Sequence, residues 1–274
     1  MIIDSHQHFW KYNSVRDAWI DDTMEVIRKD FLPKDLEPIL EENGVDGCIA
    51  VQADQTETET EFLLACAAKY PFIKGVVGWV DLTAENLEDR LIHYAANPLF
   101  KGIRHIVQAE KDDYLLRTDV QSGIGKLAKH NLTYDILVFP KQLAAALALV
   151  QRFPEQQFVL DHIAKPNISA PMNNVWKDQI TALSKCENVS CKLSGMVTET
   201  ENFVFSDEVF TPFMDHVFAS FGANRLLFGS DWPVCLLAAD YNKVFALIND
   251  YLGLHSAKTK AQVLGINATK IYNL

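Results

Sequence analysis

Two histidines separated by one residue, His6 and His8, closely follow the apolar segment Met1–Ile3, with Asp4 and Ser5 between. If this stretch is a strand, alternate side chains point to one face, so both imidazoles project together, roughly 7 Å apart along the strand. Asp4 shares that face, one step deeper. Two imidazoles side by side at a strand end can bind a metal ion or a substrate oxygen. The alternative is a chance pair of surface histidines.

Other polar residues recur late in apolar runs or directly after them, which is the pattern of an active site built at strand ends. They are Arg104 and His105, Asp135, His162, Lys192 and Asp231.

Asp231 stands where an apolar run changes abruptly to Ser230-Asp231-Trp232-Pro233. A carboxylate in that position can orient a water molecule and take its proton, although a helix cap or turn aspartate is the alternative. His162 follows Asp161 and precedes the basic Lys165. The alternative interpretation of His162 is a hydrogen-bonded histidine that packs in the core.

Neighbouring residues of a strand face opposite sides, so only one of Arg104 and His105 can point into the protein interior. We expect Arg104 to do so, as a fixed cation for an oxyanion or carboxylate, and the other residue to pack against helices. Asp135 and Lys192 are either site residues or partners in an internal ion pair, and the sequence does not separate these.

Three histidines and one aspartate can complete a mononuclear zinc site in which a bound water is the nucleophile. The same four groups can instead act without metal. His6, His8 and His162 would then stabilise the oxyanion, and Asp231 would take the proton of the water. Both possibilities stay open at this point.

The elements that position these groups are strand-like runs alternating with helix-like runs, in eight units. The predicted strands are 1–8, 47–52, 75–80, 100–106, 132–138, 157–162, 189–194 and 226–229. Strands that are almost wholly apolar and each followed by a helix are buried on both faces and run parallel. We therefore predict a single (β/α)8 TIM-type barrel, regular or distorted, as one domain over residues 1–274. A doubly wound open sheet is the rival, but His6-Gln7-His8 stands where its glycine-rich phosphate turn would lie.

A long loop, Phe9 to Leu32, follows the first predicted strand and carries Trp10 and Trp19. Loops of this length inside a compact domain are commonly lids over a site. The helices predicted later in the chain include 120–130 and a final one at 257–272.

The composition excludes several classes of partner. The chain is 49% hydrophobic with a formal net charge of −11 and no basic cluster, which argues against nucleic acid and anionic membrane. The five cysteines are scattered, and Cys48 and Cys191 lie inside apolar runs, so we expect free thiols rather than a disulfide framework. Neither a signal peptide nor a membrane-spanning run is recognisable, which indicates a cytoplasmic protein.

Five ordered segments together resemble one branch of the amidohydrolase superfamily, that of the sugar-lactone hydrolases and their pyrone-dicarboxylate relatives. They are Asp4–Trp10, Lys101–His105, Leu160–Pro166, Lys192–Gly195 and Phe228–Pro233. The resemblance covers essentially the whole chain. It implies hydrolysis of a lactone ester by water, with Asp231 as general base and with His6, His8 and His162 binding a metal ion or the substrate carbonyl.

The resemblance also bears on cofactor and substrate contacts. Binuclear members place a carboxylated lysine or a glutamate on strand four and a histidine on strand five, whereas this chain offers Arg104, His105 and Asp135. It therefore implies at most one divalent ion, zinc first, or catalysis without metal. The candidates for substrate contact are Arg104, His105, Trp10, Lys165 and Trp232.

Arginine is sparse near the predicted strand ends, where only Arg104 and Arg117 occur. Because a dicarboxylate needs several converging cations, a neutral sugar lactone is favoured over a pyrone-dicarboxylate lactone. Tryptophan side chains suit the faces of sugars. The remaining alternatives are a metal-dependent decarboxylase of an unsaturated or aromatic acid, and a binding protein with an inactive site.

Overall fold

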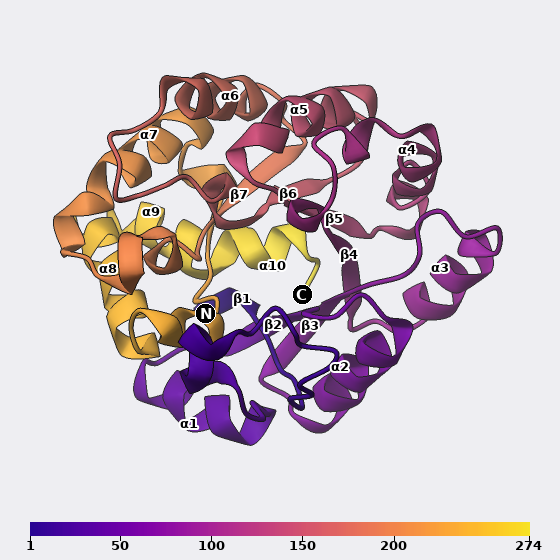
Figure 1. Ribbon diagram of the computed structural model, residues 1–274, viewed down its shortest axis with the longest axis horizontal. Helices are drawn as coiled ribbons and strands as arrows, with labels where there is room; N and C mark the ends of the chain where they lie inside the picture. The colour runs from indigo at the N-terminus through magenta and orange to yellow at the C-terminus, as the bar shows by residue number, and fades with distance from the viewer.

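The computed structural model describes residues 1–274 and consists of eight parallel strands surrounded by helices (Figure 1). The strands are β1 (Ile3–Gln7), β2 (Gly47–Val51), β3 (Ile73–Gly78), β4 (Phe100–Ile106), β5 (Thr133–Leu137), β6 (Phe158–Leu160), β7 (Val189–Leu193) and β8 (Leu226–Phe228). They pair in sequence order from β1 to β8. This order contains no reversal, so the predicted (β/α)8 barrel is confirmed and the doubly wound sheet is excluded.

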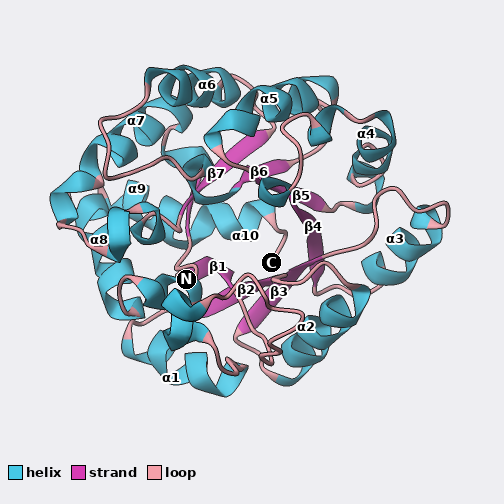
Figure 2. Cartoon of the chain, in the orientation of Figure 1, coloured by secondary structure: helices cyan, strands magenta, loops and turns pink.

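Helices separate the strands and cover the outside of the barrel (Figure 2). They are α1 (Pro33–Glu42), α2 (Glu57–Lys69), α3 (Leu87–Ala95), α4 (Thr118–Ile124), α5 (Leu143–Arg152), α6 (Asn174–Ser184), α7 (Thr211–Phe221), α8 (Tyr241–Gly253), α9 (Ala257–Ala261) and α10 (Asn267–Ile271). Because helices pack on one face of each strand and the barrel interior on the other, strands such as β2 are buried at every position. None of these helices combines the length and apolarity that crossing a bilayer requires.

The last helix lies across the ring of strands in the view of Figure 1. Ala268 of α10 and the following Tyr272 pack in one apolar cluster with Ile3, Ile49 and Val77 of the first three strands. The end of the chain therefore covers the interior of the barrel.

The ring closes between β1 and β8 through a few backbone hydrogen bonds rather than a continuous ladder. The N–H of Asp231 donates to the carbonyl of His6 at 2.8 Å, and the N–H of His8 donates to the carbonyl of Trp232 at 2.7 Å. The closing seam thus joins the histidine pair directly to the segment that follows β8.

Several elements differ from their predicted bounds, and three of the differences have an identifiable cause. The helix predicted over 120–130 ends at Ile124, since Gly125 follows it, and the chain continues through a 3-10 turn at Ala128–His130. The helix predicted over 257–272 is interrupted by a π-helical turn at Gln262–Ile266. There Gly265 lies against the carbonyl of Met1, 2.0 Å from where a Cβ would stand. The sixth strand ends at Leu160, two residues earlier than predicted, because the backbone turns into the left-handed region at His162.

The long loop after β1 folds back on itself. Trp10 and Phe31 exchange both backbone hydrogen bonds at 2.9 Å in an isolated antiparallel bridge, and Trp10 Nε1 donates to the carbonyl of Lys29 at 2.9 Å. A 3-10 helix at Asp22–Ile27 lies within the loop. The loop is therefore fixed at its base, where Trp10 enters the barrel mouth.

Candidate active site

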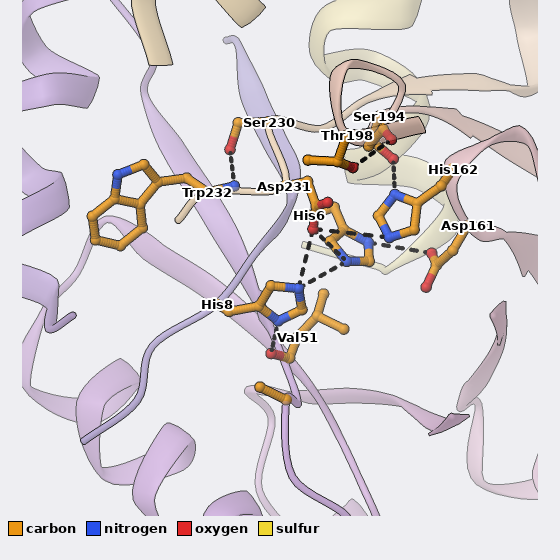
Figure 3. Close-up of polar contacts among 12 residues, drawn as sticks. His6, His8, Val51, Asp161, His162, Ser194, Thr198, Ser230, Asp231 and Trp232 are labelled. Carbon is orange, nitrogen blue, oxygen red and sulfur yellow. Dashed lines mark hydrogen bonds and ion pairs between the residues drawn. The ribbon is translucent and has the colours of Figure 1, made fainter. Parts of the chain in front are cut away.

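The two histidines of the first strand meet at the carboxyl end of the barrel (Figure 3). Nε2 of His6 lies 3.3 Å from Nε2 of His8. Nδ1 of His8 is 2.8 Å from the carbonyl oxygen of Val51, which can only accept a hydrogen bond. The proton of neutral His8 is therefore on Nδ1, and the lone pair of its Nε2 faces His6.

Asp4 does not share the face of the two histidines as expected, because the register of β1 shifts between Asp4 and Gln7 and the preceding residue, Ile3, is the one that packs in the barrel interior. Its Oδ1 accepts the N–H of His6 at 3.1 Å and the N–H of Ser230 at 2.9 Å. The side chain is fully buried, and this burial raises the pKa of Asp4 to about 6. Asp4 thus holds the backbone under the histidines and does not reach the cavity above them.

His162 lies in the loop that follows β6. The four residues His162 to Lys165 all have φ between 48° and 61°. This left-handed region costs an L-residue roughly 1–2 kcal/mol, and such strain is typical of functional sites. The turn ends β6 at Leu160 and carries the imidazole inward, so that its centroid lies 4.3 Å from that of His6. Nδ1 of His162 is 2.9 Å from Oγ of Ser194.

Gly195 makes room for this imidazole. Its φ is +59°, and a Cβ at this position would lie 2.4 Å from Nδ1 of His162. Both the backbone angle and the close approach require glycine. The loop after β7 therefore supports His162 through the hydroxyl of Ser194 on one side and the missing side chain of Gly195 on the other.

Asp231 completes the group from the loop after β8, with a φ of +59°. Its Oδ1 lies 3.3 Å from Nε2 of His8, 3.8 Å from Nε2 of His6 and 3.9 Å from Nε2 of His162. The three histidines and the aspartate that the sequence places far apart are therefore brought together in one buried cluster.

The spacing and chemistry of His6, His8 and Asp231 fit a single zinc ion, and His162 is the fourth donor nearby. Zinc–ligand distances of about 2.0–2.1 Å place tetrahedral ligand atoms about 3.3 Å apart, close to the 3.3 to 3.8 Å between the donor atoms of these three residues. The contact between Nη1 of Arg104 and Nε2 of His6, at 3.1 Å, would oppose binding of the ion. A guanidinium can only donate a hydrogen bond, so a zinc ion would compete with Arg104 for the lone pair of Nε2 of His6.

Burial and charge set the protonation of the cluster. Burial opposes ionisation of Asp231, but the neighbouring His162 and a hydrogen bond with His8 outweigh it and lower the pKa of Asp231 to about 2. Burial lowers the pKa of His6 and of His162 well below 6.5. At neutral pH the site therefore holds the ionised carboxylate of Asp231 beside the neutral imidazoles of His6 and His162, the forms that can accept a proton or bind a metal ion.

Asp161 is a site residue that sequence reasoning missed. Its Oδ1 lies 3.3 Å from Nδ1 of His6 and 3.0 Å from Nζ of Lys192, and its Oδ2 accepts from Nη1 of Arg104 at 3.2 Å. Burial opposes its ionisation, but Lys192, His6 and Arg104 together lower the pKa of Asp161 well below its usual range. The carboxylate therefore orients His6 and directs its Nε2 toward His8 and Asp231.

The question left open for Asp135 and Lys192 is answered by their contacts. Nζ of Lys192 donates to Oδ2 of Asp135 at 2.6 Å, and the hydroxyl of Tyr272 donates to the same oxygen at 2.7 Å. Both side chains of the pair are fully buried. Asp135 is therefore an interior partner of Lys192, which in turn supports Asp161.

Arg104 faces the interior and His105 does not, as strand alternation requires. The guanidinium of Arg104 contacts His6, Asp161 and Gln52. The ring of His105 stacks on Tyr114 with centroids 4.7 Å apart. The expected substrate contact of His105 is thus not supported by its position, because the side chain lies on the opposite face of β4.

A cavity of about 300 Å³ opens above the cluster. Its lining includes His8, Trp10, Trp19, Gln55, Arg104, Gln108, His162, Lys165 and Asp231. Lys165 pairs with Glu199 at 2.9 Å across the loops that follow β6 and β7.

Trp232 lies outside this cavity, although the sequence suggested it as a substrate contact. Its indole is 2% exposed and packs edge-on against Phe31 and Phe9, at centroid distances of 5.2 Å and 6.2 Å. Figure 3 shows the ring pointing away from His6. The turn at Asp231 sends the side chains of Asp231 and Trp232 in opposite directions, so Trp232 packs away from the cavity.

Comparison with known proteins places this geometry in a family. Residues 3–274 match the model described as amidohydrolase. The chain is 36% identical to an L-fucono-1,5-lactonase of Burkholderia ambifaria over 280 residues, which cover 99% of this chain and 95% of that relative.

Two solved structures have the same fold as this protein. An amidohydrolase of Burkholderia multivorans with bound zinc superposes with a TM-score of 0.97 at 35% identity, covering 100% of this chain and 99% of the other. A probable 2-pyrone-4,6-dicarboxylic acid hydrolase of Acinetobacter baumannii has a TM-score of 0.82 at 17% identity, covering 100% and 99% of the two chains, and shares the fold. The match of the family model over nearly the whole chain, together with these relatives, shows that this protein belongs to the amidohydrolase family.

Proposed function

We propose that the protein opens the ring of a sugar-acid lactone by hydrolysis. The observation that carries this proposal is the position of the ionised Asp231 within 3.3 to 3.9 Å of three imidazole nitrogens, beneath a cavity walled by two tryptophans. The 36% identity to an L-fucono-1,5-lactonase over the full chain supports the same substrate class.

In the proposed reaction, a water molecule attacks the carbonyl carbon of the lactone while Asp231 takes one of its protons. The C–O bond of the ring ester then breaks, and Asp231 returns the proton to the departing ring oxygen. The product is the open hydroxy acid. His162 and Arg104, which both line the cavity, lie where they can stabilise negative charge on the carbonyl oxygen.

We propose further that His6, His8, His162 and Asp231 can hold one zinc ion. The bound zinc of the Burkholderia multivorans structure and the donor spacing found here support this assignment. Such an ion would polarise the lactone carbonyl as a Lewis acid. Asp161 and the carbonyl of Val51 would then fix the ring orientations of His6 and His8.

Substrate contact falls to Trp10, Arg104 and Lys165, which line the cavity. The two cations are each already paired with a carboxylate, Arg104 with Asp161 and Lys165 with Glu199. A dicarboxylate would need additional free cations, so a neutral lactone is the better fit. The carboxylate that hydrolysis creates can interact with Lys165 at the cavity wall.

The experiment is a screen of purified protein against a panel of sugar-acid lactones that includes L-fucono-1,5-lactone, with proton release followed by a pH indicator. Aromatic and unsaturated acids are assayed in parallel for decarboxylation by loss of ultraviolet absorbance. We expect turnover of at least one lactone and no decarboxylation. Decarboxylation without lactone opening would reject the proposal.

A further inference from the structure

The loop between β2 and α2 presents one amide side chain, that of Gln55, to the cavity. Oε1 of Gln55 accepts the backbone N–H of Ile106 at 2.8 Å. A backbone N–H can only donate, so the contact identifies which atom of the amide is oxygen. Nε2 of Gln55 is consequently the nitrogen of the amide, and its two N–H groups make no hydrogen bond to the protein.

This loop is held in place from below. Oε2 of Glu59 accepts the backbone N–H groups of Ala53 and Asp54 at 3.0 Å and 2.6 Å. The hydroxyl of Thr56 caps α2 by accepting the N–H of Glu59 at 3.2 Å. The donor of Gln55 is therefore preorganised, since the backbone on both sides of it is fixed.

A second amide with unused capacity lines the same cavity. Oε1 of Gln108 is buried and has no hydrogen-bond partner. Arg104 and Lys165, by contrast, are already engaged with Asp161 and Glu199. Two amides are thus among the uncharged groups that a ligand can reach in the cavity, and a sugar hydroxyl, which both accepts and donates, is their natural partner.

We infer that Gln55 is a specificity-determining residue that donates a hydrogen bond from Nε2 to one ring hydroxyl of the lactone, an assignment that rests on the proposed function. A site that hydrogen-bonds a substrate hydroxyl rejects the analogue that lacks it, because the polar group of the site is then left without a partner. Gln55 accordingly selects hydroxylated lactones over deoxy lactones of the same ring size.

The test compares kcat/KM for the best lactone of the panel with a series in which each member lacks one ring hydroxyl. The variants are Gln55→Met, which removes both the donor and the anchor to Ile106, and Gln55→Glu, which keeps an acceptor for Ile106 and removes the donor. Gln151→Glu, at an exposed position of α5, controls for the added charge.

For one deoxy lactone, we expect the preference of the wild-type protein for the hydroxylated substrate to fall about tenfold in Gln55→Met and at least about threefold in Gln55→Glu, chiefly through KM. Gln151→Glu should keep the wild-type preference. Equal losses on every lactone would mean that Gln55 only tethers the loop, and unchanged preferences in both variants would likewise overturn the assignment. Failure of the wild-type protein to open any lactone would instead reject the proposed function, and this assignment with it.

Discussion

The imidazole of His162 lies against the α-carbon of Gly195, so closely that a Cβ on Gly195 would stand 2.4 Å from Nδ1 and 2.6 Å from Cγ of the ring. Neither ring atom can retreat freely, because Nδ1 is also bound to Ser194 and the backbone of His162 is in a left-handed turn. The position of one imidazole of the candidate site therefore depends on the absence of one methyl group.

Gly195→Ala should displace His162 and lower kcat at least tenfold. Gly44→Ala is the matched control, since Gly44 has a similar φ of +63° but no atom within 4 Å of the added Cβ. The control should lose roughly 1 kcal/mol of stability from backbone strain alone and keep its kcat. Lactone kinetics and thermal unfolding of both variants check this. Equal kcat values in the two variants would contradict the steric role of Gly195.

Asp231→Asn should lower kcat by about two to four orders of magnitude while the protein remains folded. The amide keeps the size of the carboxyl group but cannot take a proton from water. Indicator kinetics measure the rate, and circular dichroism with thermal unfolding checks the fold. Turnover near the wild-type rate would show that another group is the base.

Chelator-treated protein should bind one zinc ion per chain in a calorimetric titration. His8→Gln should weaken this binding at least a hundredfold, because one imidazole donor of the cluster is lost. Arg104→Gln should strengthen it, since a cation that competes for Nε2 of His6 is removed. Zinc binding that is indifferent to His8 would place the ion elsewhere.

The stability of the protein should depend on pH through Glu59, whose carboxyl group is buried below the loop that carries Gln55. Burial raises the pKa of Glu59 to about 8, against 4.5 for an ordinary glutamate. Between these values the folded protein keeps a proton that the unfolded chain has released. The free energy of unfolding therefore falls as pH rises, by up to roughly 1.4 kcal/mol per pH unit, and levels off above about pH 8.

Glu59→Gln cannot titrate but keeps an acceptor for the two backbone N–H groups. The wild-type protein should lose stability relative to this variant as pH increases from 5 to 8, measured by urea unfolding. Parallel pH curves would show that Glu59 is ionised in the folded protein.

Much of the fold could be predicted because its determinants are local. Each strand is a short apolar run followed by a helix-forming segment, and eight such units commonly fold into a (β/α)8 barrel. Strand alternation also separated Arg104 from His105, since both lie within the regular part of β4.

The same rule failed at Asp161 and His162. Alternation would send these neighbours to opposite faces, but the left-handed backbone from His162 onward brings both into the site. No residue type in His162-Ile163-Ala164-Lys165 signals such a turn, because none is glycine or asparagine. Gln55 and Gln108 were likewise not predicted, since polar loop residues carry no periodicity from which a direction could be read.

The hydrogen bonds between β1 and β8 have a consequence for the newly made polypeptide. His6 and His8 emerge early in translation, whereas Asp231 emerges late, and the backbone contacts that close the ring bring the two groups together. A chain still being synthesised has the two histidines but lacks the carboxylate of Asp231 beside their Nε2 atoms. Enzymatic turnover would therefore begin only when the final strand docks, so that activity itself reports the completion of the barrel.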